Sequence, residues 1–260
     1  MESISVAADA IFSIGPISIT NAQLGALLVT FGLILFTVFA RRGMSIVPSR
    51  IQVLLEILAD YLLTLLKNAF GSEERARKFF PIMMTVLLFL IVANQFSVVP
   101  LVTQIVAGDT PVFRVPTANL ALTVGLALAV VVAANILAFS ISPIRHIQQF
   151  IVIKPLLAAR TPSAFGLAFI DFFLGFLNII SEFAKVFSLS FRLFGNIFAG
   201  EVMVAVIAGL SAYTHFIVPI PFVALSIFSG FIQAFVFVLL AIQYIAGSIN
   251  AVEMPEPKAA

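Results

Sequence analysis

The feature that most constrains the fold is a series of apolar runs, each long enough to cross a lipid bilayer. Residues 10–40 contain no charged side chain, and further apolar runs follow at 79–106, 117–141, 165–211 and 222–250. A hydrocarbon core of ~30 Å is crossed by about 20 residues of helix. A helix satisfies its backbone hydrogen bonds internally, as a lipid environment requires. The sequence therefore predicts an all-α polytopic membrane protein with about five transmembrane helices.

The composition supports this class and excludes several others. Apolar residues make up 62% of the chain and charged residues 10%, whereas soluble domains have about 45–50% and 25%. The net charge of +2 is too small to indicate a nucleic-acid partner. Without cysteine, with two histidines and with no glycine-rich phosphate loop, the chain offers no site for thiolate, zinc or nucleotide chemistry. We expect a single membrane domain over residues 1–260, with no metal, no cofactor and no catalytic residue.

Basic residues predict the topology. The first span, 21–40, is followed at once by Arg41 and Arg42, which places that end in the cytoplasm and the N-terminus outside. The first residues carry two acids and no basic segment, so we expect no cleaved signal peptide. The span 79–106 then crosses outward, and its Asn94 and Gln95 are expected to face protein. The span 117–141 returns to a basic inner loop, and the C-terminus is cytoplasmic.

Residues 51–70 form a different kind of segment. Polar side chains lie within about 80° of one another on a helical wheel; they are Gln52, Glu56, Asp60 and Lys67. Basic residues flank the segment on both sides, so a crossing would place one basic cluster outside. The pattern favours an amphipathic helix on the cytoplasmic surface, and a further crossing is the alternative.

The run 165–211 is too long to stand upright in a membrane. It contains no proline, and as one helix its 47 residues would measure ~70 Å against a core of ~30 Å. The helix must lie strongly tilted or break, with its polar residues facing protein or water. The run 222–250 returns across the membrane at ~44 Å. We expect the two to form a long tilted hairpin.

Arg192 is the most informative residue in this hairpin. A charge at the bilayer centre costs about 2.5–3.5 kcal/mol on insertion scales and is functional by default. Small, polar and basic residues share its face within about 60°; they are Asn178, Ser181, Lys185, Ser188, Gly195, Asn196 and Ala199. Glu201 points about 180° away and Glu182 is about 80° off. We therefore expect the partner carboxylate on another protein; an arginine reaching to the membrane interface is the alternative.

The run SLSFRLFGNIFAGE at 188–201, followed by Gln233 41 residues after Arg192, resembles subunit a of the F-type ATP synthase. The resemblance extends to the order of apolar runs over most of the chain. It implies a stator subunit with two half-channels beside a rotating ring of c subunits. A proton or sodium ion neutralises a ring carboxylate, rides the ring and leaves through the other half-channel. The resemblance further implies a hetero-oligomeric complex in a bacterial inner membrane, with peripheral-stalk b subunits attached near 51–70.

The resemblance assigns roles to individual residues. Arg192 matches the essential arginine, Glu201 the acid of the outer half-channel, Gln233 the glutamine of the last helix, and Asn196 the asparagine of the FGN motif. Ser226 stands where many relatives carry a histidine. Asn119, in PTANLALT, stands where an aspartate is usual.

Several residues have a plainer alternative. An inner half-channel is expected along Asn178, Ser181, Glu182 and Lys185, and a solvated helix end is the alternative for that group. For Glu201 the alternative role is that of a glutamate at the membrane interface. For Gln233 the alternative role is a hydrogen bond between two helices. For the whole chain the rival function is a stand-alone ion channel or secondary transporter. Such proteins show inverted repeats or broken midplane helices, and neither is evident in this sequence.

Overall fold

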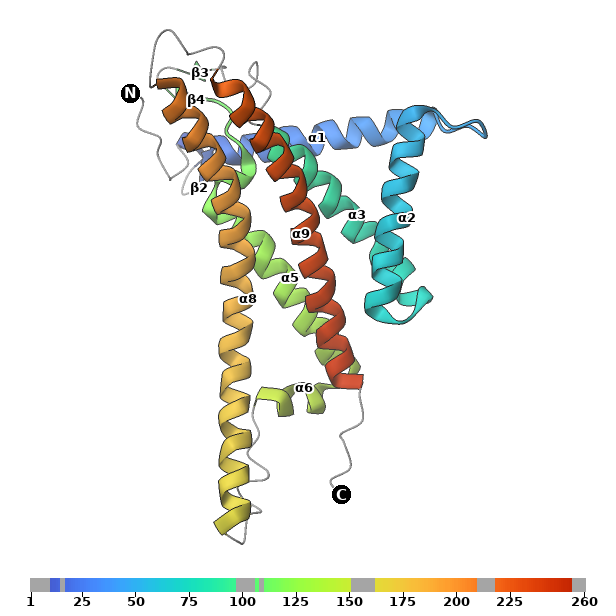
Figure 1. Ribbon diagram of the computed structural model, residues 1–260, viewed down its shortest axis with the longest axis vertical. Coiled ribbons are helices and arrows are strands. Elements are labelled where there is room, and N and C mark those ends of the chain that lie inside the picture. The colour runs from blue at the N-terminus through green and yellow to red at the C-terminus, as the bar shows by residue number, and fades with distance from the viewer. Residues whose placement is uncertain are drawn as a thin grey trace. The chain divides into compact units, whose positions relative to one another are not determined.

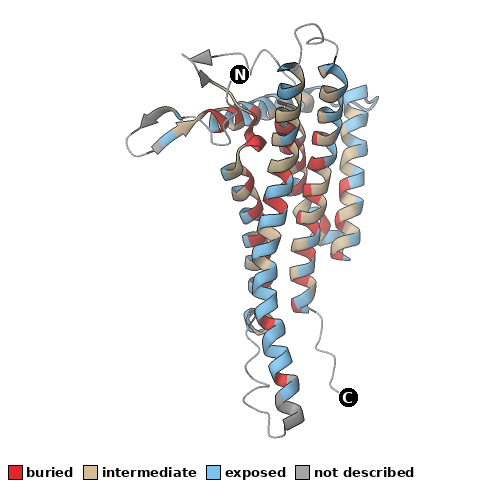
Figure 2. Cartoon of the chain, turned by 60° about the vertical axis from the view of Figure 1, so that its left-hand side comes forward, coloured by how far each residue is buried: buried red, intermediate tan, exposed pale blue. Residues whose placement is uncertain are grey.

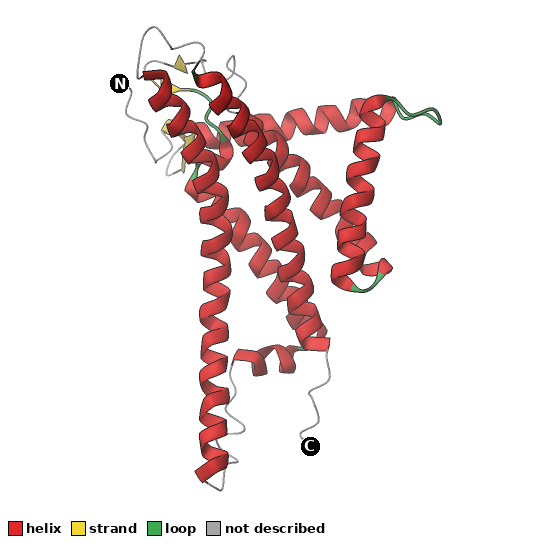
Figure 3. Cartoon of the chain, viewed as in Figure 1, coloured by secondary structure: helices red, strands yellow, loops and turns green. Residues whose placement is uncertain are grey.

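The computed structural model describes residues 10–14, 17–96, 106–107, 110–150, 162–209 and 218–253. Helices dominate this part of the chain (Figure 3). They are α1 (Asn21–Arg42), α2 (Arg50–Phe70), α3 (Glu73–Gln95), α5 (Leu120–Ile141), α6 (Pro143–Phe150), α8 (Pro162–Gly209) and α9 (Pro219–Glu253). Among the described helices, five are long and apolar enough to cross a membrane, namely α1, α3, α5, α8 and α9. The predicted all-α polytopic membrane fold is confirmed.

Two small antiparallel hairpins and one 3₁₀ turn accompany the helices. Strands β1 (Ala10–Ile14) and β2 (Ile17–Thr20) pair with Ser13 opposite Ser18. Strands β3 (Val106–Ala107) and β4 (Thr110–Pro111) form the second hairpin, and the 3₁₀ turn η2 covers Pro116–Ala118. The sequence analysis did not predict these elements, because each is too short for a periodic pattern.

Helix α1 begins with a reciprocal cap and packs against α3 and η2. The Gln23 amide donates to Thr20 Oγ1 at 3.4 Å, and the Thr20 amide donates to Gln23 Oε1 at 3.0 Å. A side chain at Gly25 is not tolerated, since its Cβ would lie 2.3 Å from the carbonyl oxygen of Arg114. Arg41 and Arg42 occupy the last turn, where positive charge complements the helix dipole.

Helix α2 is buried only along its C-terminal half. Leu62, Leu66 and Phe70 are buried, and α2 packs against α3. The Phe70 ring stacks on Phe79 with centroids 4.8 Å apart. Gly71, at φ 62°, ends the helix in the left-handed conformation that glycine adopts without strain. In Figure 1, α2 turns sharply away from the direction of α1. The location of α2 on the membrane surface stays a prediction.

Several helix bounds differ from the sequence-based expectation. Helix α3 begins at Glu73 rather than 79, because Glu73 and Glu74 are favourable in a first turn. It ends at Gln95, and Val106 belongs to β3; residues 97–105 lie outside the described part. The helix α6 lies where an inner loop was expected.

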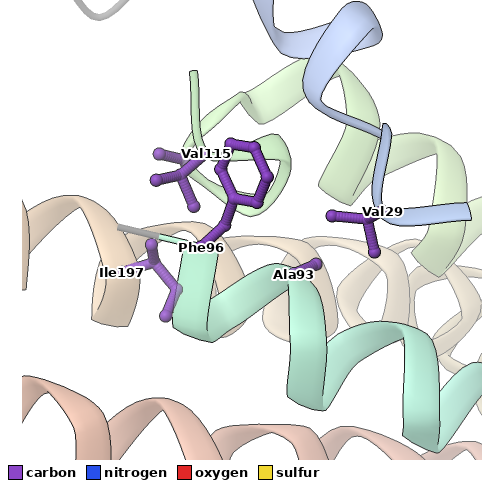
Figure 4. Packing of buried hydrophobic residues seen from close by; sticks show 6 residues of the cluster. Val29, Ala93, Phe96, Val115 and Ile197 are labelled. Atoms are coloured by element: carbon purple, nitrogen blue, oxygen red, sulfur yellow. The ribbon is translucent and has the colours of Figure 1, made fainter. Parts of the chain in front are cut away.

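The chain divides into two compact units. The first unit comprises Met1–Thr123 and Phe191–Leu239, and the second comprises Val124–Ser190 and Leu240–Ala260. The first unit is centred on a hydrophobic cluster of Val29, Ala93, Phe96, Val115, Ala118 and Ile197. Figure 4 shows the Phe96 ring, at the end of α3, beside Val115. This cluster joins α1, α3, the η2 region and the C-terminal part of α8.

Helices α8 and α9 form the predicted antiparallel hairpin. In the first unit Asn196 pairs with Ser229, and Gly200 lies against Ser226. In the second unit Lys185 lies over the Tyr244 ring. Helix α8 is continuous over 48 residues, which corresponds to roughly 70 Å, and its tilt in the membrane stays a prediction. Much of its N-terminal half is exposed (pale blue in Figure 2). Residues 210–211 of the predicted helix lie outside the described range.

Candidate functional site

Arg192 lies on an exposed face of α8 that consists of small residues. Ser188 and Ala199, one and two turns away, are exposed as well. A Cβ added to Gly195 would meet no atom within 4 Å. The guanidinium is therefore flanked along the helix by side chains that add little bulk.

In the first unit, Asn196 joins α8 to α9. The Ser229 hydroxyl donates to Asn196 Oδ1 at 2.6 Å, and Asn196 Nδ2 donates to the Ser229 carbonyl oxygen at 3.2 Å. One turn along, a Cβ on Gly200 would lie 3.1 Å from Ser226 Oγ. The asparagine next to Gly195 is thus a packing and hydrogen-bonding residue between the two long helices.

Helix α3 approaches α9 through two neutral amides. Asn94 Nδ2 donates to the Gly230 carbonyl oxygen at 2.8 Å, and Gln95 Nε2 donates to the Ile227 carbonyl oxygen at 2.8 Å. Gly230 permits this approach, because its Cβ would lie 3.2 Å from Asn94 Cβ. The expectation that Asn94 and Gln95 face protein is confirmed.

Unsatisfied polar atoms collect around this part of α9. Gln233 is 7% exposed, and its Nε2 has no hydrogen-bond partner among the described residues. The same holds for Ser226 Oγ, Asn94 Oδ1 and Gln95 Oε1. Buried polar atoms of this kind are satisfied by ordered water.

Glu201 lies on α8, partly buried, and is the only carboxylate of the sequence between Glu182 and Glu253. Arg114, from the segment before η2, is close enough for its positive charge to act on this carboxylate. Asn119 has a structural contact: its Oδ1 accepts a hydrogen bond from the Ala121 amide at 2.8 Å, at the start of α5.

The second unit contains a polar pocket of about 350 Å³. It includes all four residues predicted along the inner side of α8. The lining residues are Gln149, Phe150, Asn178, Ser181, Glu182, Lys185, Gly247, Ser248 and Ala251. The pocket therefore draws on α6, α8 and α9.

Glu182 is held at both oxygens of its carboxylate. Lys185 Nζ pairs with Oε1, and Asn135 Nδ2, from α5, donates to Oε2 at 3.0 Å. Lys185 Nζ also lies 5.6 Å from the centroid of the Tyr244 ring, a cation–π contact. These contacts link α5, α8 and α9 through one half-buried ion pair.

Helix α6 covers the same region and contains a buried histidine. His146 is 8% exposed and lies edge-on to Phe139 and Phe150, with ring centroids 6.4 and 5.1 Å away. Burial lowers the pKa of His146 below its ordinary 6.5, and the nearby Glu182 carboxylate opposes that effect. Hydrogen bonds from Asn178 to Gln149 and from Arg145 to Val252 tie α6 to α8 and α9.

Residues 23–246 match the model of a protein family described as ATP synthase A chain. The chain belongs to the ATP synthase A chain family.

Relatives in this family include proteins named ATP synthase subunit a. The protein from Geotalea daltonii is 31% identical over 84% of this chain and 82% of its own length. The protein from Citrifermentans bemidjiense is 32% identical over 86% of this chain and 85% of its own. A protein from Bradyrhizobium, named ATP synthase subunit a 2, is 29% identical over 97% of this chain and 99% of its own length.

Sequence reasoning missed two residues, Asn135 and Arg114, whose polar groups act on predicted site residues. The sequence did indicate that Asn135 faces protein, because it is the one strongly polar side chain in the apolar run 124–139. Arg114 was placed in an outer loop, and nothing in its local sequence indicated proximity to Glu201. In the part of the chain that the structure describes, no group of three histidines or acids is arranged to hold a metal ion.

Proposed function

We propose that this chain is the ion-translocating stator subunit of a rotary ATP synthase. The observation that carries the proposal is the exposed position of Arg192 on α8, flanked by Ser188, Gly195 and Ala199. Small side chains let a partner helix approach closely in a membrane. In a member of the ATP synthase A chain family, the partner that fits is a ring of c subunits, each with one ion-binding carboxylate.

Arg192 supplies a charge that does not titrate. Its guanidinium stays protonated under all physiological conditions. Facing a ring carboxylate, it favours the ionised form of that group and so promotes release of the bound ion. Fixed positive charge also opposes direct passage of cations between two water-filled paths. The arginine thereby obliges each ion to travel with the ring.

Two half-channels lead to and from this point. Glu201 relays ions on the outer side, and its polar neighbours on α8 and α9 are Gln233, Ser226 and Asn196. Asn119 belongs to the same outer path and follows Arg114 by five residues in the sequence. The unsatisfied amide and hydroxyl atoms of that region support a hydrated path. On the inner side, the pocket lined by Asn178, Ser181, Glu182 and Lys185 forms the cytoplasmic half-channel.

The chain itself makes no ATP. One charge moved through 100 mV yields about 2.3 kcal/mol, so several ring steps must be summed to drive ATP formation in another part of the complex. The b subunits of the peripheral stalk attach at α2 and resist rotation. The complex resides in a bacterial inner membrane, with this chain's N-terminus outside and its C-terminus in the cytoplasm. Family membership favours this assembly over a stand-alone channel or transporter.

The test is Arg192→Ala in membranes that carry the whole complex. We expect ATP synthesis driven by an ion gradient to be lost while the complex still assembles, because the variant removes only the fixed charge. Lys78→Ala is the matched control, since Lys78 is an exposed cation of α3 with no proposed role. Unchanged synthesis in Arg192→Ala would refute the proposal.

A further inference from the structure

The connection between α1 and α2 presents apolar side chains outward. Ile46 is 103% exposed, Val47 82% and Met44 63%. In Figure 1 this connection projects away from the corner where α1 meets α2. Exposed apolar area of this size is unfavourable in water, so the segment requires an apolar environment.

The connection is held in this shape by Gln52. The Ser45 amide donates to Gln52 Oε1 at 3.2 Å, and Gln52 Nε2 donates to the Ser45 carbonyl oxygen at 3.2 Å. The Gln52 amide in turn donates to Ser49 Oγ at 3.3 Å, which caps α2. The apolar tip is therefore fixed by hydrogen bonds at its base and does not fold back onto the helices.

Three arginines surround the tip. Arg41 and Arg42 end α1, and Arg50 begins α2; all three are exposed, and none has an ion pair among the described residues. The sequence has no acid between Asp9 and Glu56. The segment 41–50 thus combines a triple positive charge with an apolar surface.

Local helix energetics explain only two of these arginines. Positive charge at the C-terminus of α1 is favourable, which accounts for Arg41 and Arg42. Arg50 is the first residue of α2, where the helix dipole disfavours positive charge. Its position calls for an anion from outside the helix.

We propose that the segment 41–50 is a binding site for anionic phospholipid. The guanidinium groups of Arg41, Arg42 and Arg50 bind headgroup phosphates, which guanidinium matches in geometry. Met44, Ile46 and Val47 enter the boundary between headgroups and acyl chains. Because the apolar helix α1 ends at Arg42, the segment lies at headgroup level, where an anionic leaflet attracts basic residues. This inference is independent of the ion path.

The experiment uses the whole complex in nanodiscs of phosphatidylcholine, with or without phosphatidylglycerol. Ile46→Cys is labelled with a polarity-sensitive fluorophore, which is feasible because the chain has no cysteine and cysteines of other subunits are replaced by serine. We expect the emission to shift to the blue only with phosphatidylglycerol, and a spin label on the acyl chains to quench it. Replacing Arg41, Arg42 and Arg50 by glutamine should lower the affinity for phosphatidylglycerol, read from the label's emission as the phosphatidylglycerol fraction is raised, by roughly 100-fold.

The matched control removes three cations elsewhere, by replacing Arg75, Arg77 and Lys78 with glutamine at the start of α3, and should leave bound lipid unchanged. Arg50→Gln alone covers the case in which the triple variant fails to assemble: α2 should become more stable while lipid binding falls a few-fold. Equal lipid loss in both triple variants, or emission that is the same with and without phosphatidylglycerol, would overturn the proposal. So would cross-linking of the labelled residue to a protein subunit, which would identify a protein-docking surface.

Discussion

The first and second units accommodate polar side chains within apolar helices in different ways. Around Gly230, neutral amides of α3 donate to backbone carbonyl oxygens of α9, and Asn196 pairs with Ser229. Around Glu182, a charged pair lies at the wall of a pocket. Neutral amides hold helices together without the desolvation cost of charge. The charged pair of the second unit lies at the wall of the pocket, where water can reach it and lower the desolvation cost.

Under the proposed function, the same contrast distinguishes the outer half-channel from the inner one. In the first unit's part of α8 and α9, Glu201 is the only acid, whereas the pocket of the second unit has Glu182, Lys185 and the nearby His146. A path that depends on one titratable group should fail when that group is removed. A path with several titratable groups should only be slowed when one of them is removed.

Glu201→Gln should therefore have the largest effect. We expect ATP-driven ion pumping in inverted vesicles to fall by roughly 100-fold, the usual size of an acid–base contribution, because the amide cannot accept a proton. Ser226→Ala is the control on the facing helix and should cost much less. Pumping that survives in Glu201→Gln would show that the outer path does not need a carboxylate, and the contrast would fail.

Asn135→Leu should have an intermediate effect on the inner path. It removes the donor to Glu182 Oε2 and leaves the Lys185 contact in place. We expect slower pumping, and a coupling of about 0.5–3 kcal/mol with Glu182→Gln in a double-mutant cycle. Ser140→Ala is the control on the same helix, since that hydroxyl donates to the Ile136 carbonyl oxygen of its own helix. Strictly additive effects would mean that Asn135 does not act through Glu182.

These contacts also show what the sequence could and could not predict. The α8–α9 hairpin and the grouping of Asn178, Ser181 and Lys185 follow from local periodicity, because residues three and four apart share a helix face. Asn135, which bonds Glu182, and Arg114, whose charge acts on Glu201, lie on other segments, so their proximity to the site depends on tertiary packing. The first β-hairpin had a local signal that was not used, since Gly15 and Pro16 separate two short apolar runs.

The smallest expected effect concerns pH at the inner pocket. Burial lowers the pKa of His146 relative to 6.5, so the folded state binds this proton less readily than the unfolded state. The resulting stabilisation is present above pH 6.5 and is lost as the pH falls through the lowered pKa. The charged group that acts on His146 is Glu182 of α8, and its negative charge opposes the lowering of the pKa.

Hydrogen exchange in α6 measures this effect. After correction for intrinsic exchange rates, amides of α6 should open a few-fold more often at pH 5.5 than at pH 7.5, because charging His146 favours local unfolding. His146→Phe keeps an aromatic ring between Phe139 and Phe150 and removes the titration, so its exchange should not depend on pH. The neutral amides between α3 and α9 have no titrating partner, and exchange near Gly230 should stay constant in both proteins. An equal pH dependence in the wild type and His146→Phe would show that the effect does not come from His146, and the prediction would be wrong.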